Sequence, residues 1–94
     1  MDNVKTVTDL FEAFSDKLTY ASLNEIELLS QISATISMER IQRGMEQKEF
    51  AKFMNVPQKM ISNWESGDYN FTIWELCEIC AKLGLTPSLK LEKQ

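Results

Sequence analysis

Apolar and polar residues alternate with helical spacing in the middle of the chain. The apolar positions of this segment recur at intervals of one, three and four residues, at Phe50, Ala51, Met54, Ile61 and Trp64. Such intervals place the side chains on one face of an α-helix. The pattern predicts two short helices, over about 47–54 and 57–65, joined by a tight turn, with the second ending at Gly67.

The N-terminal third is predicted to form two helices. Asp9 with Glu12 is typical of a helix start, and the apolar positions that follow are Leu10, Phe11, Phe14 and Leu18. Ser22 with Glu25 forms a capping box, which predicts the start of a second, long helix that ends near Gly44. The apolar positions of this long helix are Leu23, Ile26, Leu29, Ile32, Ile36 and, less regularly, Ile41.

A fifth helix and a short strand are predicted at the C-terminal end. Thr72 with Glu75 forms another capping box, and Gly84 is a helix stop. Beyond Pro87, Leu89 and Leu91 alternate with a polar residue as in a β-strand. Because so short a strand is not stable alone, we expect it to pair antiparallel with the same segment of a twofold mate. Leu89 and Leu91 would then lie in the dimer interface.

The segment from Gln47 to Gly67 resembles the helix-turn-helix of the Cro/C1-type (XRE) family of repressors. The family pattern is Gln-x-x-x-Ala, then Val, Ile-Ser and Glu-x-Gly, and this chain has it at Gln47, Ala51, Val56, Ile61, Ser62, Glu65 and Gly67. The likeness continues to Leu85 and covers residues 36–85. Together with the elements that the residue pattern predicts, it implies an all-α fold of five helices with a short C-terminal strand. We expect an N-terminal helical extension (1–21), a helix-turn-helix DNA-binding domain (22–85) and a C-terminal strand and tail (86–94).

The polar face of the motif has the residue types that bind DNA. Gln58 and Asn63 have amides that can bond adenine, and Lys59 can donate to guanine or to phosphate. The alternative is an ordinary solvated helix face. By resemblance, these three residues fall where the family contacts bases, and Ser62 more often contacts phosphate or the edge of the core. Gln47 at a helix N-terminus favours a phosphate contact.

Four more residues are candidates for phosphate contact: Arg40, Arg43, Lys48 and Tyr69. For the two arginines a solvated face is an equal alternative. Glu65 lies in the last turn of its helix, where a carboxylate is unfavourable unless it has a cationic partner. The resemblance implies that this partner is Arg40 and that Glu65 is structural.

Charge is distributed unevenly along the 94 residues, whose net charge is −4. Residues 1–39 have seven acids and two lysines, whereas residues 40–63 have five basic residues and two acids. Because affinity for DNA depends on charge near the phosphates, the overall acidity does not exclude DNA binding. It predicts weak non-specific binding and indicates that the acidic N-terminal third faces a different partner.

The composition argues against an enzyme, a metal site or a cofactor. The chain has no histidine, no nucleophile–base pair and no glycine-rich phosphate loop. Cys77 and Cys80 form C-x-x-C, but they lie inside a predicted helix and two cysteines cannot close a zinc site. We read both as small apolar residues in a reducing compartment. The absence of a long apolar run or a leader pattern predicts a cytoplasmic protein.

Several positions depart from the family pattern. Glu46 and Pro57 replace the usual helix caps, Asp68 stands where relatives often have lysine, and Phe71 replaces a common proline. Trp74 is an aromatic residue at a position that the family leaves polar. We expect it to pack against the N-terminal helix, with a partner surface as the alternative.

The architecture around the motif resembles HigA-like antitoxins of toxin–antitoxin pairs. This resemblance implies a homodimer that binds an inverted-repeat operator, represses its own operon and neutralises an RNase-type toxin. An acidic N-terminal segment would suit a basic toxin. Two alternatives stay open: an XRE-type repressor without a toxin, and a helical protein-interaction module that has lost DNA binding.

Overall fold

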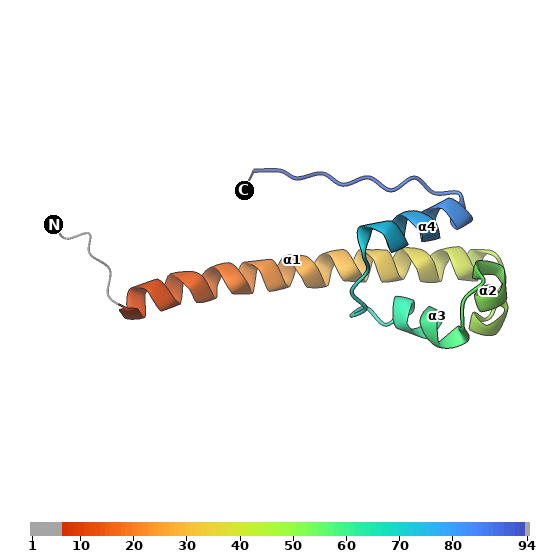
Figure 1. Ribbon diagram of the computed structural model, residues 1–94, viewed down its shortest axis with the longest axis horizontal. Coiled ribbons are helices and arrows are strands. Elements are labelled where there is room, and N and C mark those ends of the chain that lie inside the picture. The colour runs from red at the N-terminus through yellow and green to blue at the C-terminus, as the bar shows by residue number, and fades with distance from the viewer. Residues whose placement is uncertain (1–6, 94) are drawn as a thin grey trace.

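The computed structural model describes residues 7–93 and is all-helical over that range. These residues form four helices, which are α1 (Val7–Gln42), α2 (Gln47–Met54), α3 (Gln58–Glu65) and α4 (Ile73–Leu83). Helices α2, α3 and α4 pack around the C-terminal half of α1 and form a compact head, with α3 and α4 on opposite sides of α1 (Figure 1). The N-terminal half of α1 projects from this head, so the molecule extends over 64 × 24 × 20 Å.

The head has one hydrophobic core. Its buried residues come from all four helices and are Ile36, Phe50, Ala51, Met54, Ile61, Trp64, Ile79 and Leu83. The five apolar positions that predicted α2 and α3 are all in this set. Ala51 is 4% exposed, and its small side chain allows α2 and α3 to approach each other closely.

Left-handed residues end two of the helices in the head. Asn55 follows α2 with φ of 59°, and Gly84 follows α4 with φ of 74°. At the start of α4, the Thr72 hydroxyl accepts a hydrogen bond from the Glu75 N–H at 3.0 Å, as the capping box predicts. Local sequence signals therefore place α2, α3 and α4 within one residue of their predicted bounds.

The prediction of two helices in the N-terminal third is wrong, because α1 is one helix of 36 residues. Neither glycine nor proline occurs before Gly44, so nothing forces the backbone out of helical geometry at Ser22. A capping pair starts a helix only where the preceding residue is not helical. The domain boundary predicted at residue 21 falls inside this helix. Of its predicted apolar positions, Ile36 is buried, whereas Leu23, Ile26 and Ile41 are exposed.

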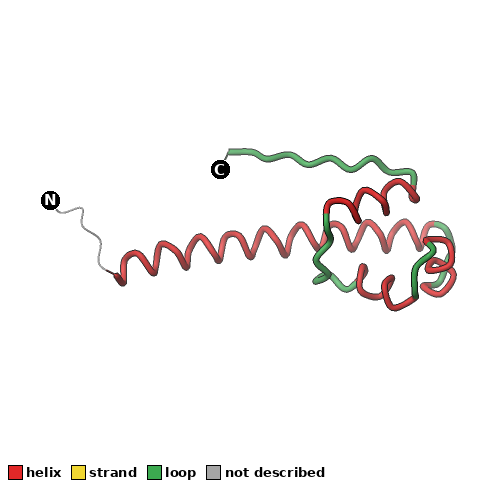
Figure 2. Tube along the Cα trace, in the orientation of Figure 1, coloured by secondary structure: helices red, strands yellow, loops and turns green. Residues whose placement is uncertain are grey.

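The predicted C-terminal strand is also not formed within residues 7–93. The tail, defined as residues 86–93, is an extended loop that runs back from α4 in the direction of the N-terminus of α1 (Figure 2). Leu89 and Leu91 remain 68% and 88% exposed. A strand requires a hydrogen-bonded neighbour, and none of the described residues forms a second strand beside the tail.

The two tryptophans have opposite environments. Trp64 is 3% exposed and lies in the core, whereas Trp74 is 72% exposed. The expected packing of Trp74 against the N-terminal helix is therefore wrong, and the alternative of a partner surface remains. None of the helices described combines the length and apolarity that a bilayer crossing requires.

This contrast provides a matched test of the core. Trp64→Ala should lower the free energy of unfolding by about 3–5 kcal/mol, because it leaves a cavity among α1, α3 and α4. Trp74→Ala should change it by less than about 0.5 kcal/mol. Urea unfolding followed by circular dichroism measures both, and equal effects would contradict the assigned register of α3.

Candidate nucleic-acid interface

One face of α3 is polar and open to solvent. Gln58, Lys59 and Ser62 are exposed and Asn63 is half-buried, while Ile61 and Trp64 point into the core. The helix begins after Pro57, whose carbonyl accepts a hydrogen bond from the N–H of residue 60. The predicted outer face is confirmed for the three exposed residues. Amide and ammonium groups on one exposed helix face can reach base edges in the major groove.

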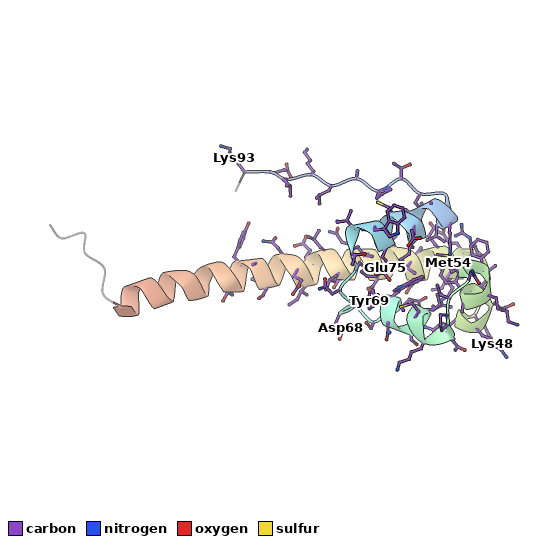
Figure 3. All side chains as sticks on the ribbon, viewed as in Figure 1. Lys48, Met54, Asp68, Tyr69, Glu75 and Lys93 are labelled. Atoms are coloured by element: carbon purple, nitrogen blue, oxygen red, sulfur yellow. The ribbon has the colours of Figure 1, made fainter. Side chains whose placement is uncertain are left out.

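The N-terminus of α2 lies beside this face. Gln47 is its first residue and is half-buried, while Lys48 is exposed and points away from the head (Figure 3). Glu46 precedes the helix in place of the usual hydroxyl cap, and its N–H donates to the Glu49 carboxylate at 3.0 Å. The remaining N–H groups of the first turn and the positive end of the helix dipole favour a phosphate.

A charged pair joins α1 to α3. Arg40 donates from Nε to Glu65 Oε2 at 2.7 Å and from a terminal nitrogen to Oε1 at 3.0 Å. Its other terminal nitrogen donates to the Met45 carbonyl at 3.0 Å. The two side chains are 17% and 8% exposed. This confirms the pairing implied for Glu65, and each of the three guanidinium nitrogens of Arg40 donates a hydrogen bond within the protein.

Gln47 connects the same pair to the outer face of α3. Its amide donates to Glu65 at 3.4 Å and its carbonyl oxygen accepts a hydrogen bond from the Ser62 hydroxyl at 3.3 Å. Two residues proposed to contact DNA are thus held in place by long hydrogen bonds within the head. Such an arrangement fixes the start of α2 relative to α3, which positions the two helices together.

The environment of Glu65 favours its charged form. Burial by itself raises the pKa of the carboxyl, but hydrogen bonds from Arg40, Ser37 and Gln47 and the charge of Arg40 outweigh it. The pKa is lowered from the ordinary 4.5 as a result. The same contact with Glu65 raises the pKa of Arg40. The pair is therefore ionised at neutral pH.

Arg43 is also engaged within the head. It donates to the Glu39 carboxylate at 2.6 Å and to the Leu83 carbonyl at 3.2 Å, and it lies over the ring of Phe53. These contacts connect α1 to the ends of α2 and α4. The two arginines proposed to contact phosphate therefore both hold the helices of the head together.

The Tyr69 side chain contacts α4. Its hydroxyl donates to the Glu75 carboxylate at 2.8 Å, and its ring packs edge-on against Phe71. Figure 3 shows the Tyr69 and Glu75 side chains close together. The hydrogen bond to this carboxylate raises the pKa of the Tyr69 hydroxyl. Asp68, which departs from the family pattern, accepts a hydrogen bond from the Ser66 hydroxyl.

Sequence reasoning missed three contacts that shape the site. Lys82 donates from its ammonium to the Met54 carbonyl at the end of α2. Arg43 reaches Leu83, and Ser37 reaches Glu65. The partners are far apart in the sequence in each case, and the only available signal was a basic residue in the last turn of α4.

No cluster that could hold a metal ion occurs in the part of the chain that the structure describes. Cys77 is exposed and Cys80 is buried. Burial is the main cause that raises the pKa of the Cys80 thiol, which keeps it protonated at neutral pH.

Comparison with known proteins agrees with this geometry. Residues 36–90 match the family described as Helix-turn-helix. The match covers more than half of the chain, and the protein belongs to this family. No curated protein and no solved structure matches the chain significantly.

The fold and the family together define the class of protein. The chain has a helix-turn-helix of Cro/C1 type (XRE family), and the outer face of its second helix is polar. Such a domain is typical of sequence-specific DNA-binding regulators. In this class the second helix of the motif enters the major groove and the first helix crosses the backbone. The corresponding helices of this chain are α3 and α2.

The charged pair makes a testable contribution to stability. Glu65→Gln should lower the free energy of unfolding at pH 7 by about 3 kcal/mol, because it leaves the Arg40 charge without its partner. Because the folded-state pKa lies below the unfolded value, this contribution is present above about pH 4.5 and is lost as the pH falls through the folded pKa.

The matched control is Glu39→Gln, which breaks the more exposed pair with Arg43 and should cost about 0.3–0.5 kcal/mol. Urea titrations between pH 3 and 7 should show the difference between wild type and Glu65→Gln shrinking towards acid. A difference independent of pH would contradict the assigned ionisation.

Proposed function

We propose that this protein is a transcriptional repressor that binds an inverted-repeat operator as a homodimer. The observation that carries the proposal is the outer face of α3, a helix that the Arg40–Glu65 pair holds in place. On this face Gln58, Lys59 and Ser62 are exposed and Asn63 is half-buried. Each chain presents one such helix, and two half-sites are needed for useful affinity. Gln47 and Lys48 at the start of α2 would bind the flanking phosphates.

The basic residues differ in how far they are free to contact DNA. Arg40 and Arg43 are engaged in the head, so the contacts to DNA fall to the exposed lysines and to the amides. Lysine and backbone contacts to phosphate position the protein, and amide contacts to bases give specificity. A net charge of −4 would keep the non-specific affinity low.

We further propose that the repressor is a HigA-like, autoregulating antitoxin whose N-terminal region binds a basic toxin. The acidic residues Asp9, Glu12 and Asp16 recur at intervals of three and four residues in the sequence of α1. The half of α1 to which they belong projects beyond the head (Figure 1). A projecting acidic helix can attract a basic protein while α3 remains available to DNA.

DNA binding is tested with the operon's own promoter. Asn63→Ala should weaken operator binding by about 1–3 kcal/mol and relax specificity at one position in each half-site. Lys59→Ala should reduce either specificity or the salt dependence of binding, according to whether it contacts base or phosphate. Lys93→Ala, in the tail, is the control. Equal affinity of the wild type for promoter and random duplex in a fluorescence titration would rule out the repressor.

The antitoxin role is tested by neutralising the acidic residues without removing the helix. Asp9→Asn, Glu12→Gln and Asp16→Asn, combined in one variant, should weaken capture of the small basic protein encoded beside this gene and leave operator binding unchanged. Co-purification measures the first and a promoter titration the second. Loss of operator binding with capture intact would reverse the assignment, and the absence of a basic neighbour would favour a repressor without a toxin.

A further inference from the structure

The tail is an extended segment whose backbone polar groups are open. Residues 86–93 leave the end of α4 and run back on the α4 side of α1, which is the side opposite α3 (Figure 1). Within the described residues, none of the backbone N–H or carbonyl groups of the tail forms a hydrogen bond to the protein. An extended segment of this kind is a template for pairing with another strand.

The side chains of the tail alternate between apolar and charged. Leu89 and Leu91 are both exposed. Lys90 and Glu92 form an exposed ion pair, with 3.7 Å between Nζ and Oε2. Because successive side chains of an extended segment point to opposite faces, one face of the tail has the two leucines and the other has the two charges.

The leucine face of the tail borders an apolar trough. The trough has a volume of about 720 Å³ and lies between α1, the start of α4 and the tail, and Leu89 is one of its lining residues. Leu28 of α1 and Ile73 and Leu76 of α4 also line it. A two-stranded ribbon is marginally stable alone and needs a helix to pack against. A ribbon that includes the tail can pack its apolar face on these two helices.

We propose that the tails of two copies of this chain pair as an antiparallel two-stranded ribbon centred on Leu91. In this register Leu91 lies directly opposite the mate's Leu91, and Lys90 lies directly opposite the mate's Glu92. The twofold axis repeats the charged contact, so the polar face of the ribbon has two Lys–Glu pairs. This inference rests on the proposed homodimer and specifies its interface.

Charge and backbone chemistry select this register. Centring the ribbon on Lys90 or on Glu92 would place two like charges directly opposite each other, which is unfavourable. Centring it on Leu89 would leave both charges without a cross-strand partner and place Leu91 opposite the mate's Pro87, which has no N–H to donate. Registers centred between two residues would place a leucine opposite a charged side chain. Only the register centred on Leu91 pairs leucine with leucine and lysine with glutamate.

The position of the ribbon is compatible with DNA binding. The tail and α3 lie on opposite sides of α1 (Figure 1). Pairing through the tails therefore takes place away from the outer face of α3. A dimer of this kind keeps both α3 helices available to the two half-sites of an operator.

Exchanging charges between two copies tests the register. Lys90→Glu should weaken the dimer about tenfold, because carboxylates then oppose carboxylates at both charged contacts, and Glu92→Lys should do the same with ammonium groups. An equimolar mixture of the two variants should associate about as tightly as the wild type, because opposite charges face each other again in the mixed dimer. Sedimentation equilibrium of the full chain without DNA, at low salt, measures each sample.

Two variants are matched controls for these charge changes. Lys48→Glu and Glu27→Lys make the same changes at exposed positions of α2 and α1, outside the tail, and should leave association unchanged. The mixture also separates contacts between chains from the ion pair within one chain, which neither Lys90→Glu nor Glu92→Lys retains. A mixture that associates no more tightly than either variant alone overturns the proposed register.

Leu91→Asp tests the pairing of the tails itself. It should weaken association about a hundredfold, because the twofold contact places two carboxylates against each other on the apolar face. The tail lies outside the core, so this variant should keep the helicity of the wild type by circular dichroism. A wild type that is monomeric at micromolar concentration, or a Leu91→Asp variant that associates as tightly as the wild type, overturns the inference.

A promoter titration separates this inference from the proposed repressor. If the wild type prefers its promoter to random duplex and Leu91→Asp remains a dimer, the repressor stands and the tail interface is overturned. If the charge exchange restores association but the wild type shows no preference for its promoter, the tail interface stands and the repressor is lost.

Discussion

The Arg40–Glu65 pair is the interaction on which the geometry of the head depends. It joins α1 to the last turn of α3 through two hydrogen bonds, and the third guanidinium nitrogen holds the carbonyl of Met45 in the turn before α2. Apolar residues of similar volume could give comparable stability at such a site. A bidentate pair in addition fixes the orientation of the two side chains relative to each other. Since Gln47 bonds to the same carboxylate, one charged group sets the positions of α1, α2 and α3 together.

The head and the rest of the chain differ in how much of their apolar surface is buried. Helices α2 and α3 have eight residues each, too few to be stable alone, and they exist because their apolar faces share one core. Outside the head, Leu23 of α1 and Leu89 and Leu91 of the tail remain exposed. The apolar faces of the head are thus buried within one chain, whereas these three leucines are not.

Electrostatic roles are also divided between these parts. The positive charge of residues 40–63 is partly used inside the head, because Arg40 and Arg43 pair with Glu65 and Glu39. What remains for phosphate is a small number of exposed lysines, including Lys48 and Lys59. With few phosphate contacts, both the electrostatic attraction to DNA and its dependence on salt are weak. Recognition of DNA by this protein would depend correspondingly more on the amides of α3 than on its net charge.

The sequence by itself determined the helix-turn-helix. Glycines, caps and apolar spacing placed α2, α3 and α4, because these signals act within a few residues of one another. They also identified the outer face of α3, and family resemblance supplied the Arg40–Glu65 pair. Only the tertiary structure decided that α1 is continuous, that Arg43 and Lys82 bind the ends of other helices, and that Trp74 and the tail are uncovered. Local patterns encode which face is apolar, but what covers that face depends on elements far away in the chain.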